Sequence, residues 1–373
     1  MRRRGVPGPP RGGRMRLVVF GLTVSSSWGN GHATLWRGLA AALARQGHRL
    51  AFFERDVPWY ARSRDLVALP GGALHLYGRW EDVLPAARAE LDRADAVLVT
   101  SYCPDGPAAS ELMLSSGAAV RAFYDMDTPV TLARARAGER VEYLPPEGLG
   151  GFDLVLSFTG GEALTQLETL LGARRAAPLY GSVDPAVHCP TAPRPEFRAD
   201  LSYLGTYASN RQAALEALLL EPARRLPHRT FAIAGSQYPA DFPWRENVLY
   251  LNHLPPEDHP AFYGSSPLTL NVTRAPMAAL GWCPSGRLFE AAACGVAVLT
   301  DPWPGLGDFF EPGREILVAR SPEEAVAAVE RAHDELARIG RAARERCLAA
   351  HTADARAREL VGLLERAGGE RAA

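Results

Sequence analysis

Residues 284–295 combine the groups that would hold a phosphorylated ligand. Ser285 and Gly286 stand where a helix is expected to begin, so backbone N–H groups there could hold a diphosphate. Arg287 supplies positive charge for the same anion. Glu290 lies one helical turn further on, where its carboxylate could accept hydrogen bonds from both hydroxyls of a ribose. A short amphipathic helix with an incidental Arg–Glu pair is the structural alternative.

Two carboxylates follow an apolar run in the first half of the chain, Asp125 and Asp127, just before Pro129. Such a pair could bind a divalent metal beneath a diphosphate, although metal coordination needs several oxygens and no third carboxylate is evident nearby. One carboxylate could instead accept the proton of an alcohol. Asp127 could also serve only as a helix cap or turn residue before Pro129.

A glycine-rich loop follows the first apolar run. Gly29 and Gly31 would let the backbone approach a ligand closely, or they could serve only to turn the chain. His32 at the helix start could bind a sugar hydroxyl or a phosphate, or it could be a cap or core residue. A dinucleotide fingerprint with Glu54 as the ribose acid is disfavoured, because Thr34 stands in place of the third glycine.

These groups follow or adjoin short apolar runs that predict strands. The runs lie at residues 17–20, 50–53, 96–99, 118–123, 154–157, 201–204, 230–234, 268–271 and 296–299. Helical patterns lie between several of the runs and at the end of the chain, at residues 32–46, 210–220, 286–294 and 322–366. Apolar strands that alternate with helices are typical of parallel sheets covered on both faces, in which ligands bind beyond the C-terminal strand ends.

A proline cluster interrupts this alternation and predicts a linker between two domains, because it can continue neither a helix nor a central strand. The predicted fold class is α/β, with two Rossmann-like, doubly wound domains. The expected organisation is a disordered tail (or an upstream start codon) over 1–14, an N-terminal domain over 15–184, a linker over 185–200, a C-terminal domain over 201–345 and a closing helix over 346–373.

The composition of the 373-residue chain excludes several chemistries. All 41 basic residues are arginine, against 42 acidic residues, so a Schiff-base lysine and a P-loop lysine are excluded. A chain of net charge -1 is not built to coat a nucleic-acid backbone, and no nucleic-acid partner is expected. The sequence has no apolar run of transmembrane length and no apolar signal segment. Its five cysteines are scattered. We therefore expect a cytoplasmic protein.

Residues 284–295, with the strand after them, look like the donor-nucleotide motif of GT-B glycosyltransferases, in which a glutamate sits before a small-residue helix that ends in Cys-Gly. Together with residues 25–32, 54–60 and 125–129, they resemble the CgeB/YkvP-like glycosyltransferase family, over nearly all of the chain from Met15 on. This resemblance implies a GT-B fold, with two Rossmann-like domains facing a central cleft and a last helix that crosses back to the first domain.

The resemblance also implies a function: metal-independent transfer of a sugar, as a hexosyltransferase-like enzyme, from a nucleotide-sugar donor to a small-molecule, glycan or protein acceptor. No cofactor and no metal are expected. Glu290 would bind the ribose, and Ser285, Gly286 and Arg287 would contact the diphosphate. Further donor-binding candidates, on the same resemblance and on their place after strands, are Gly29, Gly31, Gly205, Thr206, Arg211 and Arg274.

One position departs from the family pattern: many retaining GT-B enzymes carry a glutamate where this chain has Trp282. The stereochemical outcome is therefore open. If the enzyme inverts, a base must deprotonate the acceptor, and the candidates are His32, Asp125 and Asp127; a retaining enzyme needs no such base. The alternatives to a transferase are a nucleotide-sugar epimerase and a non-catalytic nucleotide-sugar binder in cell-surface or spore-coat assembly.

Overall fold

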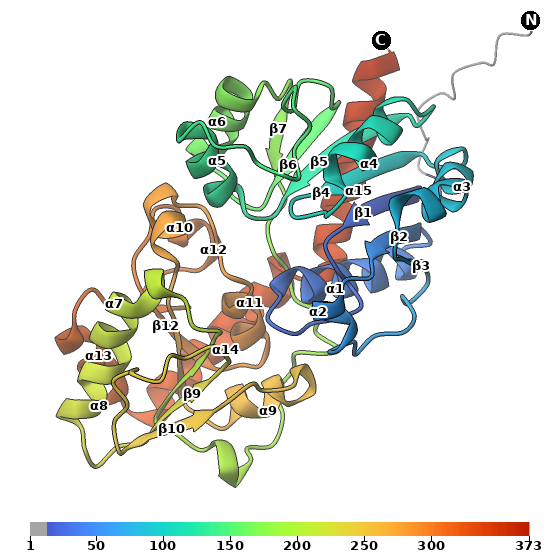
Figure 1. The fold of residues 1–373 in the computed structure, drawn as a ribbon. Helices are drawn as coiled ribbons and strands as arrows, with labels where there is room; N and C mark the ends of the chain where they lie inside the picture. The colour runs from blue at the N-terminus through green and yellow to red at the C-terminus, as the bar shows by residue number, and fades with distance from the viewer. Residues whose placement is uncertain (1–12, 373) are drawn as a thin grey trace, which may run out of the picture. The chain divides into compact units, whose positions relative to one another are not determined.

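The computed structural model describes residues 13–372, so the tail expected over residues 1–14 lies almost wholly outside the described residues. The chain forms two compact units. Unit 1 is the chain up to Tyr180 together with the segment from Ala353 onward, and unit 2 is Gly181–Thr352 (Figure 1). Each unit is built on one parallel sheet.

Unit 1 has a seven-stranded sheet in the order β3-β2-β1-β4-β5-β6-β7. Its strands, all paired in parallel, are β1 (Arg16–Gly21), β2 (Arg49–Arg55), β3 (Ala73–Tyr77), β4 (Ala96–Thr100), β5 (Val120–Asp125), β6 (Leu154–Ser157) and β7 (Ala176–Pro178). Its helices are α1 (Gly31–Arg45), α2 (Pro58–Ala61), α3 (Trp80–Leu91), α4 (Gly106–Leu114), α5 (Thr128–Arg136), α6 (Glu162–Leu171) and α15 (Ala353–Ala372). The strand order reverses between β1 and β4, the switch point at which such sheets bind ligands.

Different helices cover the two faces of this sheet. Successive residues of a strand point to opposite faces, so the contacts of neighbouring residues show which helix covers which face. Val19 of β1 belongs to the core cluster that also holds Trp36 of α1 and Leu360 of α15. Its neighbour Phe20 packs instead against Trp80 of α3, with ring centroids 5.7 Å apart. The last helix of the chain is therefore part of the core of unit 1 (Figure 1).

Unit 2 has a six-stranded sheet in the order β10-β9-β8-β11-β12-β13, which reverses between β8 and β11. Its strands are β8 (Leu201–Leu204), β9 (Phe231–Ala234), β10 (Val248–Leu251), β11 (Leu268–Asn271), β12 (Ala297–Thr300) and β13 (Leu317–Val318). Its helical segments are η1 (Pro195–Phe197), η2 (Ser209–Arg211), α7 (Gln212–Leu215), η3 (Glu216–Leu220), α8 (Glu221–Arg225), η4 (Pro256–Asp258), α9 (His259–Gly264), α10 (Ala275–Leu280), α11 (Gly286–Ala293), α12 (Leu306–Phe309), α13 (Pro322–Val329) and α14 (His333–Ala350).

The two units repeat one architecture, and the predicted α/β fold class is confirmed. Every strand expected from an apolar run is present within two residues. The helix expected over 210–220 is a series of 3-10, α and π segments, and the one expected over 322–366 is three helices.

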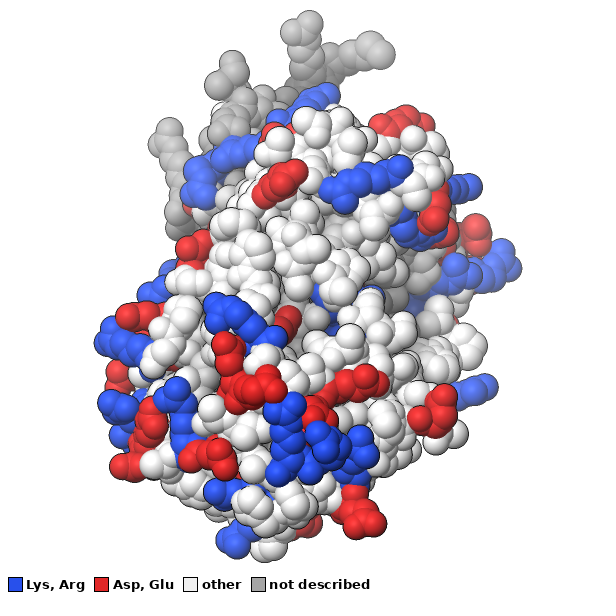
Figure 2. Space-filling model, turned by 90° about the vertical axis from the view of Figure 1, so that its left-hand side faces the viewer, with Lys and Arg blue, Asp and Glu red and all other residues white. Residues whose placement is uncertain are grey.

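On the face drawn in Figure 2, arginine and acidic side chains intermingle, in keeping with a net charge of -1. Among residues 13–372, no helix combines the length and the apolar character needed to cross a membrane.

Candidate active site

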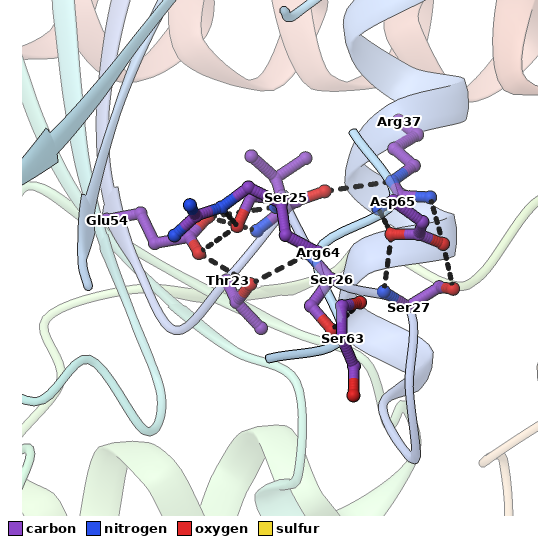
Figure 3. Close-up of polar contacts among 10 residues, drawn as sticks. Thr23, Ser25, Ser26, Ser27, Arg37, Glu54, Ser63, Arg64 and Asp65 are labelled. Carbon is purple, nitrogen blue, oxygen red and sulfur yellow. Dashed lines mark hydrogen bonds and ion pairs between the residues drawn. The ribbon is translucent and has the colours of Figure 1, made fainter. Parts of the chain in front are cut away.

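The buried carboxylate of Glu54, near the end of β2, holds the loop between β1 and α1 (Figure 3). Glu54 accepts hydrogen bonds from the backbone N–H groups of Val24 and Ser25, at 2.7 and 2.9 Å. The hydroxyls of Thr23 and Ser25 donate to its other oxygen, at 2.8 and 2.5 Å. These donors use both oxygens of the carboxylate, so Glu54 positions the loop and is not presented to a ribose.

A second carboxylate, Asp65, ties down the next part of the same loop (Figure 3). The backbone N–H of Ser27 donates to Asp65 at 3.1 Å, and the Ser27 hydroxyl donates to its other oxygen. Arg37 of α1 makes two further contacts with Asp65, at 3.2 and 2.5 Å. A Cβ at Gly29 or Gly31 would meet nothing within 4 Å, so the two glycines lie at the open tip of a tethered loop.

His32 and Asp127 form a hydrogen-bonded pair at the C-terminal edge of the unit 1 sheet. Nε2 of His32 lies 2.9 Å from Oδ2 of Asp127, and only 13% and 17% of the two side chains are exposed. Nδ1 of His32 is buried and has no hydrogen-bond partner among residues 13–372. When Nε2–H donates to the Asp127 carboxylate, Nδ1 is the ring nitrogen that keeps the lone pair.

Asp125, the last residue of β5, supports this pair from the core. It is fully buried, and one of its oxygens accepts the backbone N–H of Asp127 at 3.1 Å. Burial raises the pKa of Asp125 to about 7, while hydrogen bonds from Thr131 and from the Asp127 backbone act in the opposite direction. The two aspartates therefore have different environments. Asp127 contacts His32 directly, whereas Asp125 is buried and contacts the backbone of Asp127.

The ring of Tyr102 lies near His32, and the ring of Tyr143 packs behind Tyr102. Tyr102 follows β4 with a φ of 60°, a conformation that a non-glycine residue adopts only when its surroundings hold it there. Its ring centroid lies 6.0 Å from that of His32 and 4.9 Å from that of Tyr143. The edge of the sheet around the His–Asp pair is therefore aromatic, with a strained residue at the switch point.

In unit 2, Arg287 is held in place by neutral oxygen atoms. Its Nη1 donates to the side-chain oxygen of Asn271 at 2.8 Å, and its Nε donates to the backbone oxygen of Leu204. The guanidinium also lies over the ring of Tyr203, 5.0 Å from the centroid. These contacts fix the side chain without neutralising its charge.

Gly205, directly after β8, makes room for this arginine. A Cβ at Gly205 would lie 2.7 Å from Oη of Tyr203 and 2.8 Å from Nη2 of Arg287. Gly235, with a φ of +150°, approaches the same loop so closely that its Cβ would lie 2.1 Å from the backbone oxygen of Gly205. Two backbone segments therefore meet here at glycine positions.

Arg211 and Arg274 bring further positive charge to Arg287. Nη1 of Arg211 donates to the backbone oxygen of Thr206 at 3.3 Å, while its buried Nε has no hydrogen-bond partner in the described chain. Burial lowers the pKa of Arg211, and the charges of Arg287 and Arg274 act in the same direction. Within residues 13–372, neither Arg211 nor Arg287 forms an ion pair. An anionic ligand would supply the missing counter-charge.

The N-terminus of α11 lies beside this cluster. Ser285 caps the helix, and its hydroxyl accepts the backbone N–H of Arg287 at 3.3 Å. Glu290, one turn along, accepts a hydrogen bond from Tyr263 at 3.2 Å. A Cβ at Gly286 would lie 3.6 Å from Oε1 of Glu290, so Gly286 adjoins that carboxylate oxygen.

Trp282, shortly before α11, is fixed by its own contacts. Its φ is 44°, its indole N–H donates to Asp308 at 2.6 Å, and its backbone N–H donates to Pro304 at 2.7 Å. The indole therefore occupies this position in a defined orientation.

The structure distributes the candidate residues over two groups. One group lies in unit 1, at the C-terminal edge of its sheet next to the Gly29–Gly31 loop, and consists of His32, Asp125 and Asp127. Gly205, Thr206, Arg211, Arg274, Ser285, Gly286, Arg287 and Glu290 belong to unit 2. The sequence analysis missed Tyr102, Tyr203, Tyr263 and Asn271. Asn271 alone carried a signal, as a polar residue that ends an apolar strand.

One region of the chain matches a protein-family model. Residues 211–362 match the model described as glycosyl transferase-like. The matched region begins at Arg211 and contains Arg274, Arg287 and Glu290. A search of curated proteins finds no match.

Solved structures of glycosyltransferases share the fold over nearly their whole length. Sucrose-phosphate synthase from Thermosynechococcus elongatus is 14% identical, with a TM-score of 0.68 over 95% of this chain and 99% of that one. HepE from Anabaena in complex with UDP-glucose is 13% identical, with a TM-score of 0.67 over 95% and 100%. An α-glucosyltransferase in complex with UDP-glucose and DNA is 10% identical, with a TM-score of 0.69 over 94% and 100%. The chain therefore has the GT-B fold.

Proposed function

We propose that this protein is a metal-independent glycosyltransferase that moves a sugar from a nucleoside-diphosphate donor to a hydroxyl acceptor. Unit 2 binds the donor, and unit 1 supplies the His32–Asp127 pair to the acceptor. The observation that carries the proposal is the arginine cluster of Arg211, Arg274 and Arg287 beside the N-terminus of α11. The glycosyl transferase-like match over residues 211–362 supports the same placement.

The donor site of unit 2 has the groups that a leaving diphosphate requires. Negative charge grows on the diphosphate as the bond between sugar and oxygen breaks, and positioned arginines with a helix N-terminus stabilise that charge. Arg287 is already oriented by Asn271 and Leu204, so little reorganisation is needed during the reaction. Glu290 binds the ribose hydroxyls through its carboxylate.

The base on the acceptor side is the imidazole of His32. The Asp127 carboxylate accepts Nε2–H, which leaves the lone pair on Nδ1, and stabilises the imidazolium that forms when Nδ1 takes the acceptor proton. Attack by the deprotonated hydroxyl then inverts the anomeric carbon. The indole of Trp282, held by Asp308, stands where a retaining enzyme of this fold would carry a carboxylate.

The donor in this proposal is UDP-glucose or a related nucleotide sugar, by analogy with HepE and the α-glucosyltransferase, which were solved with UDP-glucose. The acceptor is a small molecule, a glycan or a protein. The closer resemblance to the CgeB/YkvP-like family is part of the proposal.

Calorimetry with UDP, dTDP, GDP, ADP and NAD tests the donor site. We expect one nucleoside diphosphate to bind and Glu290→Ala to weaken it by about tenfold or more, because charged hydrogen bonds to ribose are lost. Glu246→Ala, which removes an exposed glutamate elsewhere in unit 2, should bind like the wild type. No diphosphate binding, or NAD binding indifferent to Glu290, would overturn the assignment. Diphosphate release that requires an added acceptor would separate a transferase from an epimerase.

A further inference from the structure

Three side chains of unit 2 that lie far apart in sequence converge on one point. His188, His259 and Glu290 each place one ligand-type atom within 4.8 Å of the other two. They come from three segments: the stretch before η1, the first residue of α9, and the middle of α11. Two imidazoles and a carboxylate are the donor set that zinc takes in many protein sites.

His188 offers a nitrogen that the chain leaves unused. The side chain is only 3% exposed, and its buried Nε2 has no hydrogen-bond partner among residues 13–372. A buried ring nitrogen without a partner is unfavourable unless something else binds it. The backbone N–H of His188 donates to the backbone oxygen of Asp184 at 2.9 Å, which helps to fix the position of His188.

His259 is oriented in the way that metal-binding histidines usually are. Its Nε2 lies 3.2 Å from the backbone oxygen of Leu254, so Nε2 carries the proton and Nδ1 keeps the lone pair. Zinc-ligating histidines commonly donate their second ring N–H to a backbone carbonyl or a carboxylate, which holds the ring and the tautomer. The carboxylate of Glu290 is similarly supported by the hydroxyl of Tyr263.

The spacing of the three atoms fits a metal after a small adjustment. Three atoms no more than 4.8 Å apart can all lie within about 2.8 Å of a common centre, whereas zinc bonds to nitrogen and oxygen are about 2.0–2.2 Å long. Each ligand atom therefore has to move by less than about 1 Å to reach bonding distance. A water molecule completes four-fold coordination.

We propose that His188, His259 and Glu290 form a zinc site, and that zinc bound there competes with the nucleotide for Glu290. The site is regulatory rather than catalytic, because it engages the carboxylate that the donor ribose needs. The zinc site itself stands on the geometry of the three side chains. The competition rests on the proposed function, since it requires Glu290 to be a nucleotide ligand.

Zinc binding is measured first, with zinc alone and no nucleotide, by competition with a chromophoric chelator on the full chain. We expect one zinc per chain in the wild type. His188→Ala and His259→Gln should each weaken binding by at least about tenfold. His259→Gln keeps an N–H that can donate to Leu254, so its fold should be preserved. It therefore tests the site even if His188→Ala does not fold. His333→Ala, which removes an exposed histidine, should bind like the wild type. A wild-type chain that binds no zinc, or variants that bind as well as it does, would overturn the site.

The competition is measured next, by titrating UDP with and without one equivalent of zinc. Zinc should weaken UDP binding about tenfold or more in the wild type and leave His188→Ala unaffected. UDP can also chelate zinc in solution, but this would lower UDP binding equally in the wild type and in His188→Ala. The His188→Ala variant is therefore the control for chelation. UDP binding that ignores zinc would overturn the competition. If UDP fails to bind at all, the proposed function and the competition fall together, while the first measurement still decides the zinc site.

Discussion

Nε2 of His32 and Oδ2 of Asp127 lie 2.9 Å apart, although 95 positions separate the two residues in sequence. The first residue starts a helix after β1, and the second follows β5. Parallel strands bring both to the same edge of the sheet. A carboxylate that accepts one imidazole N–H fixes the tautomer and leaves the opposite nitrogen to act as a base.

Substituting Asp127 by asparagine therefore lowers turnover more than substrate binding. The amide no longer stabilises the imidazolium, so we expect kcat to fall by about 10²–10⁴ with KM little changed. Steady-state kinetics on the transferase reaction give both values. Asp241→Asn, an exposed aspartate, is the matched control. An Asp127→Asn enzyme with full activity would remove this residue from the mechanism and favour a retaining reaction.

Glu54→Gln is expected to destabilise unit 1 and loosen the glycine loop. An amide keeps one acceptor oxygen but turns its own N–H₂ toward donors that now contact the carboxylate. The loss of charge-assisted hydrogen bonds in a buried site costs about 2–4 kcal/mol. Urea unfolding measures the change. The exposed Glu81→Gln should stay within about 0.5 kcal/mol of the wild type, and equal stabilities for the two variants would contradict this account.

Gly205→Ala should weaken nucleoside-diphosphate binding without unfolding the protein. The added Cβ would lie 2.7 Å from Oη of Tyr203 and 2.8 Å from Nη2 of Arg287. Both contacts are with the ends of side chains, so the guanidinium shifts and the backbone keeps its path. We expect a loss of about tenfold in affinity, and a loss of stability of about 1–3 kcal/mol because the buried ring of Tyr203 is crowded. Gly117→Ala, where a Cβ meets nothing within 4 Å, is the control. Unaltered affinity in Gly205→Ala would show that Arg287 does not contact the ligand.

The pH dependence of stability reports on Asp125. Its pKa is raised from 3.8 to about 7 in the folded protein by burial, so the folded chain holds a proton that the unfolded chain has released between these values. The contribution of Asp125 to stability is therefore complete below pH 4 and is lost as the pH rises to 7.

Asp125→Asn removes this pH dependence. The stability of the wild type relative to the variant should fall by on the order of 4 kcal/mol between pH 4 and pH 8. Urea unfolding of both proteins across that range tests the prediction. Parallel stability curves would mean that Asp125 is ionised in the folded state throughout.

The central strands could be predicted from sequence because burial on both faces makes them continuously apolar. The residues Val97–Leu98–Val99 are an example, and all three are fully buried. The missed strands are the edge strands of the two sheets: β3, β7, β10 and β13. β10 is only partly buried, β3 has exposed residues at two positions, and β7 and β13 have three and two residues. Such strands leave no apolar run to detect.

Part of the candidate site could likewise be predicted from sequence, and part could not. Ser285, Arg287 and Glu290 are close in sequence, so helical spacing alone places them together. The pairing of His32 with Asp127, and the support of Arg287 by Asn271, depend on strand order, which composition and periodicity do not encode. The tether through Glu54 is a further example, since its hydrogen-bond donors lie about 30 positions upstream.

The placement of α15 has a consequence for how the protein is made. Ala357, Leu360 and Leu364 of this helix are fully buried in the core of unit 1, yet they are translated after the whole of unit 2. Unit 2 is one continuous stretch and can fold as soon as it has left the ribosome. Unit 1 keeps an exposed apolar face until α15 is available, so unit 2 can complete its fold before unit 1 does.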